Sequence, residues 1–444
     1  MRVIIIGGIA AGMSAAAKFR RLDKDAHIKV YEKTSIVSFG ACGLPYFVGG
    51  FFDNEKQMIA RSPEKFKETG IDISVEHEVL SVDVDNKKIT VKNLKTNETF
   101  EDNYDKLMIA TGASAIIPPI KNFNIENVHT LKSLEDGRIL KEKMKDESIK
   151  KVAIIGAGFI GLEAVEAARE YKKEVSVFQL EDRILKEVFD KEVTDLLEQE
   201  LKNKGVNLFL NSKVVELKGD IKVTKVVTEN EEIDTDLVIL ATGVKPNTAF
   251  LQDTGIEMLK NGAIVVDKEG KTSIEHIYSA GDCATVTHLL KPEQAYIPLA
   301  TVANKFGRIV GENISGKGIE YEGSLGSACI KVLEMEAGRT GLTESEANSL
   351  GINYKTVFIT DKNQTDYYPG QESISIKLIY NGDTKVILGA QVVGKKDAVQ
   401  RTNALAVAIY AKLTTEQLGM MDFCYSPPFA RTWDILNRVG NVAK

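Results

Sequence analysis

The sequence predicts an α/β protein with two Rossmann-like dinucleotide folds and a third, C-terminal α+β domain. A β-branched run followed by a glycine-rich turn and a helical stretch opens the chain, and the same pattern returns near residue 152. From about residue 326 the chain has strands and a helix of its own. A chain of 444 residues exceeds what one hydrophobic core usually organises, so several domains are expected.

The first two domains are predicted from an internal duplication. Both copies run from a β-branched strand through a glycine-rich turn and a helix to a second strand, and each is later followed by a strand that ends in Ala-Thr-Gly. The segments of the first copy are Val3–Ile6, Gly7–Gly12, Ile28–Tyr31 and Leu107–Gly112. Those of the second are Val152–Ile155, Gly156–Gly161, Val175–Phe178 and Leu237–Gly243. A repeated strand-turn-helix-strand unit indicates two nucleotide-binding folds in one chain.

The order of these segments predicts the domain boundaries. We expect a first nucleotide-binding domain at residues 1–115 and 248–325, a second at 116–247, and a C-terminal domain at 326–444. Alternating apolar and polar residues predict an antiparallel meander near residues 75–100. Further elements are predicted at Leu134–Lys145 (helix), Ser375–Tyr380 and Val386–Val393 (strands) and Ala398–Tyr410 (helix).

Composition excludes several classes of protein. The chain is 43% hydrophobic and 27% charged, and its net charge of −6 lacks the basic footprint of a nucleic-acid-binding protein. No apolar run reaches the roughly 18 residues of a membrane span. The four cysteines are scattered without a CxxC pair and the histidines form no metal-binding pattern, so we expect no metal site and a reducing, cytoplasmic setting.

The second glycine-rich turn fits the dinucleotide fingerprint GxGxxG. Gly156 allows the tight turn, Gly158 allows close approach of a pyrophosphate, and Gly161 allows the helix to pack on the strand. The position where a carboxylate would bind a ribose is Gln179, eighteen residues after Gly161. Without that charge to repel a 2′-phosphate, both NADH and NADPH stay possible, and Arg183 nearby does not by itself make an NADP site.

The first glycine-rich turn departs from the fingerprint, because Ile9 occupies the position of the middle glycine. A second signal supports it. Glu32 ends the next strand twenty residues after Gly12, where a carboxylate can bind a ribose hydroxyl. We therefore predict a nucleotide site here as well.

A third nucleotide motif, Ala280-Gly281-Asp282, completes a resemblance to a known family. Two dinucleotide folds, two Ala-Thr-Gly strands and this motif together resemble the FAD-containing pyridine-nucleotide disulfide oxidoreductases over essentially the whole chain. The resemblance implies bound FAD, with NADH or NADPH as the second nucleotide. The predicted cofactor-binding residues are Gly7, Gly8, Ala11, Gly12, Glu32, Lys33, Ala110, Thr111, Gly112, Gly156, Gly158, Phe159, Ile160, Gly161, Gln179, Gly243, Asp282 and Ala300.

The chemistry is predicted to depend on Cys42, in the string Ser38-Phe39-Gly40-Ala41-Cys42-Gly43-Leu44-Pro45-Tyr46. Neighbouring glycines and a helix start would expose the thiol and favour its thiolate. Enzymes like glutathione reductase have two cysteines here with four residues between them, whereas this chain has Val37 and Phe47 at the two candidate positions. A lone thiolate cycles through a mixed disulfide with a substrate thiol or through a sulfenic acid.

The cysteine string resembles the coenzyme A disulfide reductase branch of the single-cysteine subfamily, which also includes NADH oxidases, NADH peroxidases and polysulfide or persulfide reductases. Peroxidases and water-forming oxidases of that subfamily carry a histidine in the first glycine loop, where this chain has Ala10 and Ala11. The resemblance also implies that Tyr367 and Tyr425 from a partner subunit act as hydroxyl donors beside the cysteine. That arrangement would require a homodimer with a shared active site.

The resulting prediction is an NAD(P)H-dependent flavoprotein that reduces coenzyme A disulfide or a related small disulfide, with Phe159 as a gate where nicotinamide stacks. The predicted substrate-binding residues are Ser38, Phe39, Arg20 and Arg21; a charge pair at a helix end is the alternative interpretation of the two arginines. The alternatives are an NADH oxidase producing hydrogen peroxide, a polysulfide or persulfide reductase, and a non-catalytic redox-sensing flavoprotein. Polysulfide reductases often carry an extra sulfur-transfer domain, which is not expected in a chain ending at Lys444.

Overall fold

The computed structural model describes all 444 residues, which form two units. The first unit contains residues 1–44, 52–116 and 244–324, and the second contains residues 45–51, 117–243 and 325–444. The second and third predicted domains thus fall in one unit. Residues 45–51, which we expected in the first domain, belong to the second unit. None of the helices combines the length and the apolar composition needed to cross a membrane.

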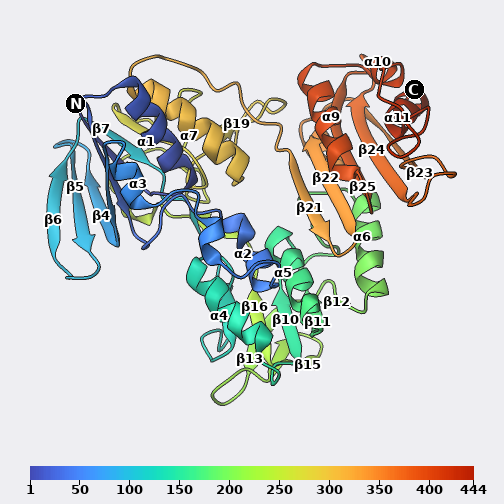
Figure 1. Cartoon of the computed structure of the whole chain (residues 1–444), viewed down its shortest axis with the longest axis horizontal. Helices are drawn as coiled ribbons and strands as arrows, with labels where there is room; N and C mark the ends of the chain where they lie inside the picture. Colours follow the sequence, from blue (N-terminus) through green and yellow to red (C-terminus); the bar gives the residue numbers. More distant parts are fainter. The chain divides into compact units, whose positions relative to one another are not determined.

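The first unit is built on a five-stranded parallel sheet in the order β18-β7-β1-β2-β3. Its strands are β1 (Arg2–Ile6), β2 (His27–Glu32), β3 (Ile71–Val75), β7 (Lys106–Ile109) and β18 (Ile277–Ser279). Helix α1 (Ala10–Leu22) packs closely on α7 (Ala300–Ile314), as Figure 1 shows. A Cβ atom on Gly307 or Gly311 of α7 would lie 2.4 or 2.5 Å from a backbone oxygen of α1, so only glycine allows this approach.

Smaller elements complete the first unit. The predicted meander is confirmed as an antiparallel sheet of β4 (His77–Asp83), β5 (Lys88–Asn93) and β6 (Thr99–Asn103). Two short antiparallel pairs follow, β8 (Ala113–Ala115) with β17 (Val244–Pro246) and β19 (Val286–Thr287) with β20 (Gln294–Ala295). The remaining helices are α3 (Pro63–Lys67), η1 (Ala41–Gly43), η2 (Glu55–Met58) and η3 (Ala249–Leu251).

The second unit contains a parallel sheet in the order β12-β11-β10-β16-β9, in which four strands correspond to those of the first sheet and the fifth, β9, precedes the others in the chain, whereas β18 follows them. Its strands are β9 (Val128–Thr130), β10 (Lys151–Ile155), β11 (Glu174–Phe178), β12 (Asn207–Phe209) and β16 (Leu237–Leu240). Beside it lies the antiparallel sheet β13 (Val214–Lys218), β14 (Lys225–Thr228) and β15 (Glu232–Asp234). The helices are α2 (Leu44–Val48), α4 (Leu134–Lys145), α5 (Phe159–Glu170) and α6 (Lys191–Asn203). The predicted duplication is therefore confirmed strand by strand.

The C-terminal part of the second unit is an antiparallel sheet in the order β21-β22-β25-β24-β23. Its strands are β21 (Ala328–Val332), β22 (Met335–Gly341), β23 (Tyr354–Lys362), β24 (Ser373–Asn381) and β25 (Ile387–Gly394). The helices are α8 (Glu344–Ser349), α9 (Ala398–Tyr410), α10 (Thr415–Gly419) and α11 (Ile435–Val442). Helix α9 packs on β22 and β25, and its bounds are those predicted.

A buried polar network joins the second parallel sheet to the C-terminal sheet. The Lys377 side chain is only 1% exposed, and its Nζ donates to Glu192 at 2.8 Å and to Glu344 at 2.6 Å. Burial acts to lower the pKa of Lys377, but these hydrogen bonds and the nearby Asp190 leave it raised. Gln391 in turn donates to Asp190 at 2.6 Å. Because a buried charge without its partner is costly, this network fixes α6 against the C-terminal sheet.

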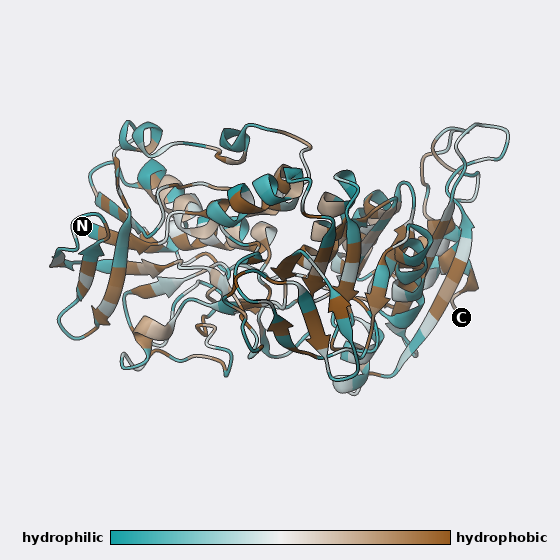
Figure 2. Ribbon diagram, turned by 90° about the horizontal axis from the view of Figure 1, so that it is seen from below, coloured by the Kyte–Doolittle hydropathy of each residue, from teal (hydrophilic) through white to brown (hydrophobic).

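The hydropathy of the side chains agrees with this arrangement of sheets and helices (Figure 2). Figure 2 shows mostly hydrophobic central strands, whereas the helices carry hydrophobic and hydrophilic residues on different sides. The strands β1, β10 and β16 are buried almost throughout, as expected of parallel strands covered on both faces.

Candidate active site

The first glycine-rich turn is held in a shape that requires glycine. Gly7 has a φ of +106°, and a Cβ atom there would lie 2.2 Å from the carbonyl oxygen of Ala110. A Cβ atom on Gly12 would lie 1.9 Å from the oxygen of Gly7. The turn between β1 and α1 therefore contacts the Ala110-Thr111-Gly112 motif that follows β7.

Glu32 is buried beside this turn. Its Oε2 accepts a hydrogen bond from the amide of Gly8 at 2.6 Å, and its Oε1 accepts from the Thr34 amide and hydroxyl at 2.8 and 2.7 Å. The carboxylate thus lies against the glycine loop, where it can accept a further bond from a ribose hydroxyl. Lys33, which we predicted at the same site, instead donates to Glu78 of β4 at 2.6 Å.

The third nucleotide motif, Ala280-Gly281-Asp282, lies beside the first glycine-rich turn. Gly281 has a φ of +89°, and its Cβ position would lie 3.0 Å from the Cβ of Ala11 and 3.8 Å from that of Ala303. The Sγ of Cys283 lies 3.5 Å from the oxygen of Ile109, at the end of β7. The structure therefore brings the three predicted FAD motifs together at the carboxyl ends of the parallel strands. Ala300 lies close by as the first residue of α7.

Both glycine loops fit a pyrophosphate. Neither α1 nor α5 has a side-chain hydrogen bond at its N-cap, so no capping side chain takes their first N–H groups. Such N–H groups and the positive end of the helix dipole favour a phosphate. In the second loop, a Cβ on Gly156 would lie 2.4 Å from the oxygen of Ala241 and one on Gly161 would lie 1.9 Å from the oxygen of Gly156. Gly158 faces open space.

Gln179 takes the place of Glu32 in the second fold. Its Oε1 accepts a hydrogen bond from the amide of Ala157 at 2.9 Å, and the Leu185 amide donates to the Ala157 oxygen at 3.0 Å. The side chain at the end of β11 therefore meets the glycine loop as Glu32 does, but without a charge. Phe159 and Ile160 begin α5 and are half-buried, and Gly243 follows β16 with a φ of +106°.

The cysteine loop is tied to the first glycine loop by backbone hydrogen bonds. The Ser38 amide donates to the Gly8 oxygen at 2.8 Å, and the Ala60 amide donates to the Ser38 oxygen at 3.0 Å. Ser38 holds a φ of 54°, a left-handed conformation that is uncommon outside glycine. Phe39 is buried, whereas Cys42 is exposed.

The environment of Cys42 differs in one respect from the expectation. We predicted the cysteine at a helix start, but it lies in the 3₁₀ turn η1, and α2 begins two residues later at Leu44. Because α2 has only five residues, the helix dipole at the thiol is smaller than the sequence suggested.

The two predicted tyrosines come together in the C-terminal domain. The hydroxyl oxygens of Tyr367 and Tyr425 lie 3.0 Å apart, and this hydrogen bond raises the pKa of Tyr367. Their loops are joined by a bond from the Thr365 hydroxyl to the Pro427 oxygen at 3.1 Å. Tyr367 is 70% exposed and Tyr425 is 44% exposed, so both hydroxyls are accessible to a partner molecule.

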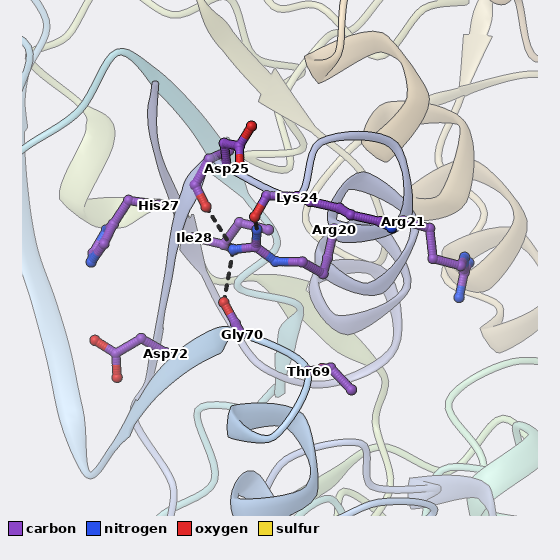
Figure 3. Close-up of a pocket in the computed structure, with 10 residues that line it drawn as sticks. Arg20, Arg21, Lys24, Asp25, His27, Ile28, Thr69, Gly70 and Asp72 are labelled. Atoms are coloured by element: carbon purple, nitrogen blue, oxygen red, sulfur yellow. Dashed lines mark hydrogen bonds between the residues drawn. The ribbon is translucent and has the colours of Figure 1, made fainter.

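The two predicted arginines lie at a cavity of about 630 Å³ in the first unit, but they do not converge. The Arg20 guanidinium donates to the carbonyl oxygens of Asp23, Lys24, Ala26 and Gly70 at 2.6 to 3.2 Å. Figure 3 shows Arg20 pointing into this cluster and Arg21 pointing away from it. Arg20 therefore fixes the turn from α1 to β2 and diverges from Arg21, and binding of substrate phosphates by these arginines stays a prediction.

Sequence reasoning missed Glu163 and Tyr46. Glu163 lies in α5, and its Oε1 is 3.5 Å from the hydroxyl of Tyr46 in α2. Burial and the neighbouring Glu166 raise the pKa of Glu163 to about 7, whereas the hydrogen bond from Tyr46 acts to lower it. The available signal was a glutamate four residues after Phe159, hence on the same face of the helix.

Two nucleotide folds in one chain, with a cysteine loop hydrogen-bonded to one of them, define a redox protein that can pass electrons between nucleotides and sulfur. The chain belongs to the pyridine nucleotide-disulphide oxidoreductase family. The family matches residues 1–307, and its dimerisation domain matches residues 327–435.

Relatives with three different names align over the full chain. The chain is 39% identical to an NAD(P)H coenzyme A polysulfide/persulfide reductase of Pyrococcus horikoshii, covering 100% of this chain and 98% of the relative. It is 36% identical to an NADH oxidase of Enterococcus faecalis (100% and 99%). It is 31% identical to a coenzyme A disulfide reductase of Staphylococcus aureus (100% and 100%).

A solved structure, reduced Bacillus anthracis CoADR-RHD, matches with a TM-score of 0.96 at 33% identity and covers 100% of this chain and 80% of that one. The alignment with the Pyrococcus relative corrects one argument from the sequence. A protein named as a polysulfide/persulfide reductase has nearly the same length as this chain, so a missing sulfur-transfer domain does not separate the alternatives.

Proposed function

We propose that this chain is an FAD-dependent NAD(P)H oxidoreductase that reduces coenzyme A disulfide, or a related small disulfide, through Cys42. The observation that carries the proposal is the placement of Cys42. Its thiol is exposed in a loop whose Ser38 amide is bonded to the first glycine loop, so the cysteine belongs to the FAD fold. Relatives named for coenzyme A disulfide and polysulfide reduction support a sulfur substrate.

The chain's residues have distinct roles in this reaction. FAD, when bound, supplies the transfer of electrons from the nicotinamide coenzyme to sulfur. The two glycine loops and Glu32 hold the nucleotides. The Cys42 thiolate attacks one sulfur of the disulfide, forms a mixed disulfide and releases the other half as a thiol. Each turnover consumes one NAD(P)H, one proton and one disulfide and releases NAD(P)⁺ and two thiols.

Two tyrosines supply hydroxyl groups for the leaving sulfur. We assign Tyr367 and Tyr425 to a cysteine loop of a second copy of the chain, because the dimerisation domain of the family contains them. Phe429 and Trp433 are 72% and 52% exposed in the same domain, as expected of a surface that a second copy covers. A tyrosine hydroxyl can steady or protonate a departing thiolate.

The negatively charged part of coenzyme A falls to Arg21 rather than to Arg20. Arg21 and Lys24 are both exposed at the cavity of Figure 3, while the Arg20 guanidinium is bonded to carbonyl oxygens. Free cations at a cavity attract phosphate groups. The proposed chemistry also places the enzyme in the cytoplasm, where small thiols are kept reduced.

Polysulfide or persulfide reduction is the second candidate, favoured by the Pyrococcus relative of nearly equal length. It uses the same cysteine and differs in the sulfur compound attacked. An NADH oxidase producing hydrogen peroxide is the third candidate, and the Enterococcus relative is named an NADH oxidase without its product. A non-catalytic redox sensor is the remote alternative, and NAD(P)H consumption with any acceptor excludes it.

The test begins with the mass of the native protein. We expect an adduct of one coenzyme A, less two hydrogen atoms, that dithiothreitol removes. The adduct should be absent from Cys42→Ser and present in Cys424→Ser, which changes another exposed cysteine. NADH consumption with coenzyme A disulfide, with polysulfide and with oxygen alone then ranks the acceptors.

Only the two sulfur activities should require Cys42. Full turnover of coenzyme A disulfide by Cys42→Ser would contradict the proposal. Consumption of oxygen at a rate above that of both sulfur substrates would favour the oxidase instead.

A further inference from the structure

The two tyrosines lie on separate loops of the C-terminal domain. The first tyrosine loop, residues 363–372, connects β23 to β24 and contains Tyr367. The second tyrosine loop, residues 420–434, connects α10 to α11 and contains Tyr425. Neither loop contains a helix or a strand. The 3.0 Å separation of the two hydroxyl oxygens therefore depends on contacts that hold the loops together.

One buried arginine binds the backbone of both loops. Arg401 of α9 is 8% exposed, and its Nη2 donates to the Asn363 oxygen at 3.0 Å and to the Phe429 oxygen at 3.4 Å. Asn363 is the first residue of the first tyrosine loop, and Phe429 lies four residues after Tyr425 in the second. A single guanidinium nitrogen thus joins a carbonyl group of one loop to a carbonyl group of the other.

Asp434 holds the guanidinium group in this place. Asp434 is 6% exposed, and its Oδ2 accepts from the Nη2 and Nε of Arg401 at 2.6 and 3.2 Å. Its Oδ1 also accepts from the Leu436 amide at 2.9 Å, at the N-cap of α11. Because a buried charge is costly without its partner, the ion pair restricts Arg401 to the orientation that reaches both loops.

Hydrogen bonds within each loop connect these anchored residues to the tyrosines. In the first loop, Gln364 is fully buried, and its Nε2 donates to the backbone oxygens of residues 368 and 369 at 3.1 and 2.9 Å. In the second loop, the Phe429 amide donates to the Ser426 oxygen at 2.9 Å, which closes a turn beside Tyr425. Each tyrosine therefore lies next to a turn that is attached to a residue bound by Arg401, or to its neighbour.

A second buried arginine of the same domain has different contacts. Arg339 of β22 is also 8% exposed and is paired with Glu346 at 3.0 Å. It donates in addition to the backbone oxygens of Val188 and Gly341. These three partners lie outside both tyrosine loops. Arg339 is therefore a matched control for the loss of a buried, ion-paired arginine.

We propose that Arg401 is a positioning residue for the pair Tyr367 and Tyr425, which it holds at hydrogen-bonding distance by binding the backbone of both loops. The inference rests on the proposed function, in which this pair steadies or protonates the thiolate that leaves the disulfide. Arg401 acts through the tyrosines and not on the substrate. Its replacement should therefore slow the sulfur half of the reaction and leave the reduction of the flavin by NADH unchanged.

The first measurement reports the tyrosine pair without reference to activity. A fluorotyrosine is incorporated at position 425 of the FAD-loaded enzyme, and its fluorine NMR resonance is recorded. Tyr367→Phe removes the bond between the hydroxyl groups and gives the resonance of a broken pair. A lysine ammonium lacks the planar set of donors that binds a carboxylate and two carbonyl groups together. We expect Arg401→Lys to move the resonance most of the way to that of Tyr367→Phe, and Arg339→Lys to leave it in place.

Kinetics then measure the consequence for the reaction. With coenzyme A disulfide, we expect the kcat of Arg401→Lys to fall about tenfold, while the KM for NADH and the rate of flavin reduction by NADH stay within about twofold. Adding Tyr367→Phe to Arg401→Lys should cause a smaller loss than Tyr367→Phe causes alone, because two changes that act through one pair are not additive. Arg339→Lys should keep the kcat of the unmodified enzyme.

Two results would overturn the proposal: an unmoved fluorine resonance in Arg401→Lys, and fully additive losses in the double variant. If Arg401→Lys does not fold, Asp434→Asn takes its place. It keeps an acceptor for the Leu436 amide and removes the charge that orients Arg401, so the resonance should move in the same direction. An unmoved resonance in that variant contradicts the proposal as well.

The same variants distinguish this inference from the proposed function. A normal rate of coenzyme A disulfide reduction by Tyr367→Phe would refute the role of the tyrosines in that reaction. A moved resonance in Arg401→Lys, with none in Arg339→Lys, would still support the positioning of the pair by Arg401.

Discussion

The two nucleotide folds of this chain share the backbone of their first turn but differ in side chains at the middle of that turn and at the end of the second strand. Gly7 and Gly156 have φ values of +106° and +105°. A Cβ atom on Gly12 or Gly161 would lie 1.9 Å from the oxygen of the turn's first glycine in each fold. Four of the five strands also have the same order, and only the outer strands β18 and β9 come from different places in the chain. Such agreement shows that both turns need glycine for the same contact between strand, turn and helix.

Two of the differing positions are those where the fingerprint predicts contact with the nucleotide. Ile9 stands where the second fold has Gly158, and Glu32 stands where it has Gln179. Glu32 accepts three hydrogen bonds within the chain, whereas Gln179 accepts one from Ala157. We therefore expect a few side chains beside a common turn to select the nucleotide.

The largest effect is expected from the shared glycines, because the two folds should fail in different ways. Gly12→Ala and Gly161→Ala each place a methyl group within 1.9 Å of a backbone oxygen, so the turn must shift, at a cost of about 1–3 kcal/mol or more. Gly12→Ala should lose FAD from the purified protein. Gly161→Ala should keep its flavin absorbance at about 450 nm. NADH should no longer decrease that absorbance, because the flavin is no longer reduced.

Retention of FAD by Gly12→Ala, or its loss from Gly161→Ala, would contradict the assignment of the folds. Thermal unfolding of both variants serves as the control, since a similar clash should lower their stability by similar amounts.

Exchanging the acidic and neutral side chains should have a smaller effect. Gln179→Glu can keep the bond to the Ala157 amide while adding a charge near the ribose, so it should repel a 2′-phosphate. We expect the ratio of kcat/KM for NADH over NADPH to rise about tenfold, with little change for NADH. Glu32→Gln in the first fold should weaken FAD binding about tenfold, since bonds to a charged acceptor contribute more than neutral ones.

Steady-state kinetics with both coenzymes and FAD titration of the apoprotein measure these changes. An unchanged coenzyme ratio in Gln179→Glu would show that the ribose of the coenzyme does not lie at the end of β11.

The parallel folds could be predicted from sequence because each is encoded locally. A β-branched strand, a glycine turn and an alanine-rich helix occupy about thirty consecutive residues, and the pattern occurs twice. The helix at Leu134–Lys145 also has the predicted bounds, and in the structure Ser133 and Asp136 form a capping box at its start. The pairing of Tyr367 with Tyr425 came from the family resemblance, and their 3.0 Å hydrogen bond shows that the two loops meet.

The remaining features depend on contacts between distant segments, which a local pattern does not contain. Residues 45–51 follow the cysteine loop in sequence but pack on α5, more than a hundred residues later. Glu163 is ordinary in sequence, and its pKa is raised by burial in the folded chain and by the neighbouring Glu166. Arg20 likewise gave no sign that four carbonyl oxygens would surround its guanidinium.

The smallest effect on the fold, and the sharpest test of the difference between the two loops, is expected from Gly158→Ala. Its Cβ would meet no atom of the chain within 4 Å, and the backbone there, with a φ of −83°, suits alanine. The free energy of unfolding should therefore stay within about 0.5 kcal/mol of the unmodified value. FAD content should be unchanged, because Gly158 lies in the second fold. The first fold carries a side chain, Ile9, at the equivalent position.

The new methyl group should instead meet the coenzyme. In the fingerprint, the middle glycine lets the pyrophosphate approach the backbone, so we expect the KM for NADH to rise about tenfold at nearly constant kcat. Urea unfolding, flavin absorbance and steady-state kinetics separate the two effects. If the KM does not change, the pyrophosphate does not approach Gly158, and the second fold tolerates a side chain there as the first one does. A loss of stability without a change in KM would assign the glycine to packing.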